Sequence, residues 1–151
     1  MERQSLVDLL GAWTHHRWGQ GADGAEIHRA EQQLGRRFPP DYLGFLRHLG
    51  WCQVGPFEVY GLGSDVNQRV DLVCNTAWER YQALPSLPHH LIPFHPDGLG
   101  NHLCLDASRI EGEHCPVVYW LHDGLPEEQA QACFPSFDAW LLDTFGVPDS
   151  A

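Results

Sequence analysis

LIPFHPDGLGNHLCLDASRIEGEHCPVVYWL, residues 91–121, is the stretch of sequence that decides the fold. It holds two short apolar runs, 91–94 and 102–105, on either side of the turn-forming residues 97–101. Apolar runs separated by Asp, Gly and Asn in this way predict a β-hairpin. The β-branched and aromatic run at 116–121 predicts a further strand. The segment therefore predicts an antiparallel sheet.

Helical periodicity surrounds this segment. Asp23 and Glu26 have the spacing of a capping box, Gly35 is a suitable helix end, and Ser136 is a suitable N-cap. A short strand is expected around 57–59, where apolar residues alternate with Glu58. Apolar residues recur every three or four positions, as in amphipathic helices, over 5–13, 26–34, 40–49, 65–83 and 137–145.

Helices first, strands in the middle and a helix last predict an α+β fold, in which an antiparallel sheet packs with N-terminal helices and a C-terminal helix. We expect one domain over residues 1–151, since this length suits a single core. Trp13, Trp78 and Trp140 fall on predicted helix faces, so we expect them in that core.

Charge narrows the class of partner. Twenty Asp and Glu residues against nine Arg and no Lys give a formal net charge of −11. Such a field repels nucleic acid and anionic membranes and attracts a basic protein. No apolar stretch is long enough to span a membrane, and no signal peptide begins the sequence, so we expect a cytoplasmic protein.

Catalytic and cofactor motifs are missing from the sequence. No nucleotide-binding loop, nucleophile elbow or recognisable catalytic triad is present, so no enzyme and no cofactor is predicted. The five cysteines show no zinc-knuckle spacing and are expected to be small buried thiols. The histidine-rich segment 89–123 has the chemistry of a metal site, but its spacing favours solvated or hydrogen-bonding histidines. A metal-dependent hydrolase stays open as one alternative.

Three blocks of sequence carry a family resemblance. The first contains Ala25-Glu26-Ile27, Glu31, Leu34-Gly35, Phe38-Pro39, Tyr42 and Phe45-Leu46. The second runs from Phe94 to Asp106 and continues into Pro116-Val117-Val118-Tyr119-Trp120 and His122, and the third is Ser136-Phe137-Asp138-Ala139-Trp140-Leu141. In this order, over about residues 6–145, they resemble the SUKH superfamily, which contains the fungal Smi/Knr cell-wall synthesis regulators and many bacterial proteins. The chain departs from the family at Leu49-Gly50-Trp51, where an Asn-Gly pair is usual.

The resemblance implies an α+β domain without catalytic activity. In bacteria such domains commonly serve as immunity proteins that bind and neutralise a polymorphic toxin, often a nuclease. The acidity fits, because a nuclease presents a cationic surface to nucleic acid. A regulatory or scaffolding interaction module is the alternative that the same family offers, and the sequence decides neither the toxin nor the oligomeric state.

For the partner-binding surface we expect acidic loops around the sheet, with one tryptophan as an aromatic anchor. The alternative is that these carboxylates are only solvated and that the tryptophan is buried. The residues are Asp97, Asp106, Trp120, Asp123, Glu127 and Glu128.

Overall fold

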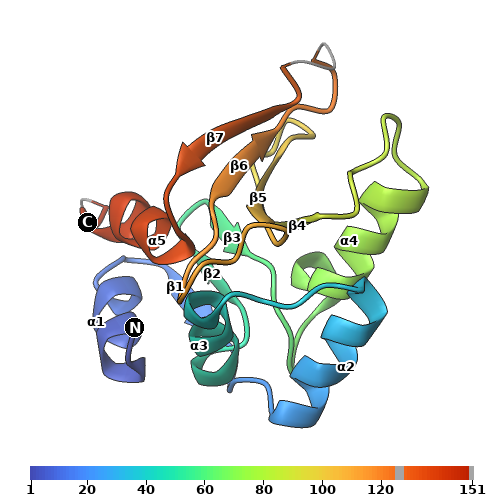
Figure 1. The fold of residues 1–151 in the computed structure, drawn as a ribbon. Helices are drawn as coiled ribbons and strands as arrows, with labels where there is room; N and C mark the ends of the chain where they lie inside the picture. Colours follow the sequence, from blue (N-terminus) through green and yellow to red (C-terminus); the bar gives the residue numbers. More distant parts are fainter. Residues whose placement is uncertain (125–127, 150–151) are drawn as a thin grey trace.

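The computed structural model describes residues 1–124 and 128–149, and it has the predicted α+β fold with antiparallel strands (Figure 1). The helices of this part of the chain are α1 Arg3–Gly11, α2 Gly24–Leu34, α3 Pro40–His48, the short 3-10 helix η1 Gln68–Val70, α4 Leu72–Tyr81 and α5 Phe137–Phe145. The strands are β1 His16–Trp18, β2 Cys52–Val54, β3 Phe57–Val59, β4 Leu91–Pro96, β5 His102–Asp106, β6 Val117–Trp120 and β7 Ala130–Phe134. None of these helices has the length and apolar character needed to cross a membrane.

The strands form two sheets where the sequence predicted one. The smaller sheet has the order β1-β2-β3, and the larger has the order β4-β5-β6-β7. The two sheets meet where the Tyr60 main-chain N–H donates to the main-chain oxygen of Phe94 at 2.8 Å. Strands β1, β2 and β7 were not predicted, because β1 and β2 have only three residues each and β7 contains two alanines, a residue depleted in strands.

The predicted helix boundaries at α2 and α5 are confirmed. Asp23 and Glu26 form the reciprocal capping box, and Gly35 takes the left-handed conformation, with φ of 68°, that ends α2. The Ser136 side chain accepts a hydrogen bond from the Ala139 main-chain N–H and so caps α5. These short polar side chains satisfy main-chain N–H groups that have no partner within the helix.

The helix predicted over 65–83 is shorter than expected. It begins at Leu72, because a β-bridge to Gly61 holds Asp71 in extended conformation. In this bridge the Gly61 N–H donates to the main-chain oxygen of Val70 and the Gly61 oxygen accepts from the Leu72 N–H, both at 2.9 Å. The Asp71 carboxylate then accepts from the Cys74 N–H at 3.1 Å. The cap and the bridge fix the start of the helix one residue after Asp71.

The buried face of α4 corrects the expected position of Trp78. Helix α4 buries Leu72, Thr76 and Arg80, which are spaced four residues apart on one face, so Trp78 lies on another face and is 62% exposed. Trp13 and Trp140 are buried as predicted.

The main core lies between α3, α5 and the two sheets. Tyr42 is its centre: its ring packs against Phe45, Phe94 and Phe137, and its hydroxyl donates to the main-chain oxygen of Tyr60 at 2.6 Å. These pairs are stacked with Phe45, tilted with Phe94 and edge-to-face with Phe137, and such aromatic contacts stabilise the core beyond simple burial of area. A smaller cluster on the other face of the four-stranded sheet contains Leu87, Leu91, Cys104, Val118 and Trp120.

Candidate protein-binding surface

The turn between β4 and β5 is organised by Asp97. Its carboxylate accepts from the main-chain N–H groups of Leu99, at 2.7 Å, and Asn101, at 3.1 Å. The Asn101 amide and the Tyr119 hydroxyl also donate to it. Burial opposes ionisation of Asp97, but these hydrogen bonds outweigh it and lower the pKa of the carboxyl. Asp97 is therefore a charged and half-buried turn residue whose oxygens are largely occupied within the protein.

The network extends to the β6–β7 connection. The Asn101 side-chain oxygen accepts from the main-chain N–H of His122 at 3.0 Å and lies 2.7 Å from His122 Nδ1. Through Asn101, one polar network therefore joins the β4–β5 turn to the end of β6.

Two of the expected surface residues point inward. Asp106 is only 8% exposed, and its Oδ1 accepts from the Ser108 hydroxyl at 2.6 Å and from the Ser108 N–H at 3.2 Å. Trp120 is only 6% exposed, because it packs in the smaller cluster with Leu87 of the loop after α4. In this structure Asp106 stabilises a turn and Trp120 fills the smaller cluster, so neither presents its functional group to a partner.

Two of the remaining expected residues, Asp123 and Glu128, lie in the connection between β6 and β7. Asp123 and Glu128 are exposed, and Glu127 lies outside the described residues. The structure thus brings Asp97, Asp123 and Glu128 to one end of the four-stranded sheet, since the network above joins the turn at Asp97 to the end of β6.

The histidine-rich segment does not converge on a metal site within residues 1–124 and 128–149, where no three His, Cys, Asp or Glu side chains could hold an ion. His95 and His102 are buried. His102 Nε2 lies 3.3 Å from the Tyr60 hydroxyl, and Nδ1 lies 3.3 Å from a Glu79 oxygen without hydrogen-bond geometry. Burial lowers the pKa of His102 to about 4, so its ring is neutral at pH 7.

The cysteines divide into two groups. Cys52, Cys104 and Cys115 are buried as expected, whereas Cys74 and Cys133 are exposed. The exposed pair corrects the expectation for these positions, because Cys74 lies on α4 away from its buried face and Cys133 lies on β7, whose first four residues are exposed.

An exposed apolar surface on α4 and the loop after it was not predicted. Trp78 is 62% exposed, Tyr81 71% and Leu84 88%, and we call these three residues the α4 surface. Trp78 and Tyr81 are three residues apart and so lie on the same side of α4. Large apolar groups exposed together mark sites of protein interaction. Of these three residues only Trp78 was assigned a place in the sequence analysis, where it was expected in the core.

The α4 surface lies near the acidic end of the sheet. Glu79, next to Trp78, lies against His102 at the start of β5, and its main-chain oxygen accepts from the Leu87 N–H at 2.9 Å. Leu87 in turn packs with Trp120, at the end of β6 that leads to Asp123. Apolar side chains and exposed carboxylates are thus presented on neighbouring elements, as at many protein interfaces.

A comparison with families of known proteins agrees with this fold. A family model named SUKH_5 and described as SMI1-KNR4 cell-wall matches residues 5–146, nearly the whole chain. A search of curated proteins with the sequence of this chain found no match. The matched residues run from α1 to the end of α5 and include both sheets. The chain belongs to the SMI1-KNR4 family of the SUKH superfamily.

Proposed function

We propose that this chain is a non-enzymatic protein-binding domain that acts as a bacterial immunity protein and neutralises a basic toxin by direct binding. The observation that carries the proposal is the α4 surface, where Trp78, Tyr81 and Leu84 are exposed. Tryptophan and tyrosine supply much of the binding energy at protein interfaces because they bury large areas at small entropic cost. The family membership and the acidic charge support the same function.

The charge suits a toxin whose own target is nucleic acid. Such a toxin carries a cationic surface, and the net charge of −11 attracts it over long range. Asp123 and Glu128 are exposed near the α4 surface and add local attraction. Charge then sets the rate of association, while the aromatic residues set the lifetime of the complex.

Co-expression with a basic toxin, such as one encoded next to the gene of this chain, tests the proposal. We expect the wild-type chain to restore growth and to co-purify with the toxin. The double variant Trp78→Ala/Tyr81→Ala should weaken the complex by about 100-fold, as loss of two aromatic contacts does. Leu142→Ala, which truncates an exposed apolar residue on α5, is the matched control and should bind as the wild type does.

Two outcomes would count against this function. If the toxin kills equally well with and without the chain and no complex forms, the chain is not its immunity protein. If the chain instead binds several cellular proteins and protects against no toxin, the regulatory or scaffolding function is favoured.

A further inference from the structure

Strand β7 has an open edge. It is the last strand of its sheet, and no described segment pairs with its outer side. The opposite end of the sheet differs, because there Phe94 of β4 accepts a hydrogen bond from Tyr60, the residue after β3. Figure 1 shows β7 on the outer side of the sheet, with α5 at its C-terminal end.

The pairing with β6 decides which main-chain groups of β7 point outward. The Leu121 N–H donates to the Gln129 oxygen at 2.8 Å, and Tyr119 pairs with Gln131. In an antiparallel pair, residues alternate between those that bond to the partner strand and those that point away from it. Ala130 and Ala132 therefore direct their main-chain N–H and C=O groups away from β6.

Lysine, proline and a covering segment, three usual protections of an edge strand, are missing from β7 among the described residues, although its pairing with β6 shifts register where Val117 and Val118 face Phe134 and Ala132. Its sequence, AQACF, contains no charged residue and no proline, and its first four residues are exposed. Natural proteins commonly block such edges with lysine, proline or a covering segment, because an open edge pairs readily with another strand. The alanine side chains leave room for a neighbouring strand to approach.

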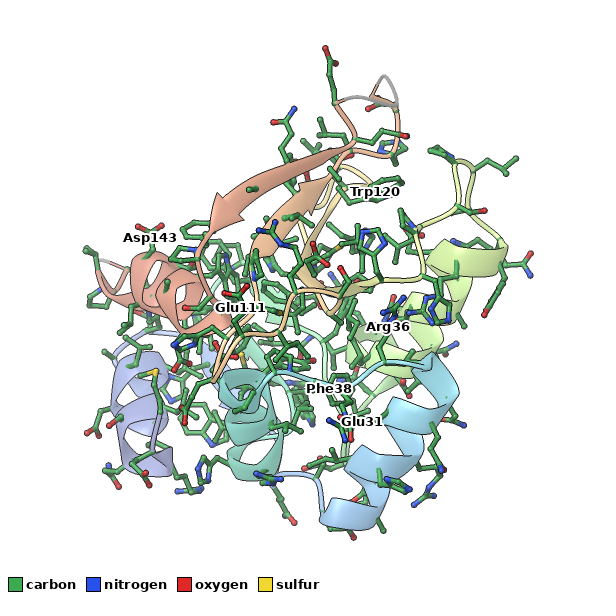
Figure 2. All side chains as sticks on the ribbon, viewed as in Figure 1. Glu31, Arg36, Phe38, Glu111, Trp120 and Asp143 are labelled. Atoms are coloured by element: carbon green, nitrogen blue, oxygen red, sulfur yellow. The ribbon has the colours of Figure 1, made fainter. Side chains whose placement is uncertain are left out.

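Acidic residues lie near both ends of this edge. Asp123 and Glu128 are exposed by the start of β7, and Asp143 is exposed on α5, which contacts β7 and is close to its end in Figure 2. Arg109 and Glu111, which line a groove with Pro135 just past β7, balance each other. The edge is thus uncharged along its length and negative around its ends.

We propose that the β7 edge binds an extended, positively charged segment of a partner protein, which adds to the sheet as a fifth strand. Main-chain hydrogen bonds to Ala130 and Ala132 supply the pairing, and basic residues toward the ends of the segment meet the acidic groups. A second copy of this chain suits the edge less well. Antiparallel pairing of two β7 strands would place Glu128 of each copy near Asp143 of the other.

Peptide binding to the isotope-labelled full chain, followed by NMR, tests this proposal without any toxin. The probe is the blocked hexapeptide Arg-Thr-Val-Thr-Val-Arg. We expect it to shift the amide signals of Ala130 and Ala132 and to slow their hydrogen exchange, with a Kd of about 1 mM. The same peptide with Glu in place of Arg, or with its four central nitrogens methylated, should bind at least about tenfold more weakly.

Two variants of the protein test the same main-chain contacts by changing Ala132 of β7 instead of the peptide. Ala132→Pro removes an outward N–H at an edge position, where proline is tolerated, and should abolish binding. Ala132→Ser keeps the N–H and should bind as the wild type does. If Ala132→Pro fails to fold, binding of the N-methylated peptide to the wild-type chain still tests whether main-chain hydrogen bonds hold the peptide.

Several results would overturn the edge proposal: no shift at millimolar peptide, shifts confined to Trp78 and Tyr81, binding that ignores N-methylation, or dimers that pair through β7. The proposal extends the proposed function by naming how a partner segment binds, but the two can fail separately. Peptide binding without toxin neutralisation would leave the edge site standing and overturn the immunity function. Toxin neutralisation without peptide binding would support the immunity function and overturn the β7 edge site.

Discussion

The Arg80 guanidinium of α4 donates from Nη1 to the main-chain oxygen of Leu34, the last residue of α2, at 2.7 Å. Its Nη2 donates to the main-chain oxygen of His89, just before β4, at 2.8 Å. Arg80 is only 6% exposed, and burial lowers its pKa. One buried cation therefore joins α2, α4 and the approach to the four-stranded sheet, and it satisfies a carbonyl group at a helix C-terminus, where positive charge is favourable.

Replacing Arg80 with methionine should lower the free energy of unfolding by about 3 kcal/mol, because two carbonyl groups lose a charged donor. Urea denaturation measures this change. Arg37→Met removes an exposed arginine nearby and should change stability by less than about 0.5 kcal/mol. Equal midpoints for the two variants would show that water replaces the Arg80 hydrogen bonds at no cost.

Asp97→Asn should lower the free energy of unfolding by about 1–2 kcal/mol, since a charged acceptor of four hydrogen bonds becomes neutral. The pKa of Asp97 is lowered in the folded chain, so its stabilisation is complete above the unfolded value of about 3.9 and is lost as pH falls below it. The difference between wild type and variant should therefore shrink below about pH 4. A difference that stays constant with pH would mean that the charge of Asp97 is not what stabilises the turn.

His102 should make the protein less stable in mild acid. Its pKa is about 4 in the folded chain and about 6.5 when unfolded, so the unfolded chain takes up a proton first as pH falls. Stability from the neutral ring is complete above about pH 6.5 and declines toward pH 4, which gives a loss of about 2 kcal/mol between pH 7 and pH 5. His102→Gln should remove this part of the loss, as measured by urea denaturation at both pH values.

The exposed histidine His28 on α2 provides the control for this prediction. His28→Gln should keep the wild-type dependence on pH. If His102→Gln also keeps it, the buried ring is not the group responsible. His95 is buried too, and burial lowers its pKa, so a smaller slope in the same direction should remain in the His102 variant.

The sequence predicted the helix ends and the turn that are stabilised by residues close to one another in the chain. The Asp23–Glu26 capping box, the Ser136 cap and the turn at 97–101 each place a polar side chain within a few residues of the main-chain group that it satisfies. For α4 the signal was incomplete, because the bridge between Gly61 and Asp71 delays the start of the helix, and because the buried face of α4 holds Thr76 and Arg80 instead of Trp78. Ten residues separate these partners, and helical periodicity does not reveal such a contact.

The candidate binding surface was harder to predict for the same reason. Trp120 is buried in a cluster with Leu87. Trp78 is exposed because Leu72, Thr76 and Arg80 form the buried face of α4. Charge and composition predicted the acidity of the surface, and Asp123 and Glu128 are exposed as expected. The open edge of β7 has no local signature, because it depends on which strand ends the sheet.

Charge reversal at the acidic end of the sheet should slow binding of a basic toxin. Asp123→Arg/Glu128→Arg changes two exposed residues and should lower the association rate constant by about three- to tenfold at low salt, with a weaker dependence on salt and little change in dissociation. Stopped-flow mixing measures both rates. Glu2→Arg/Asp8→Arg makes the same change in net charge at the exposed surface of α1, far from the sheet end. If this control slows association equally, the toxin responds to the total charge of the chain and not to the carboxylates beside β7, because only a local effect depends on where the charge is placed.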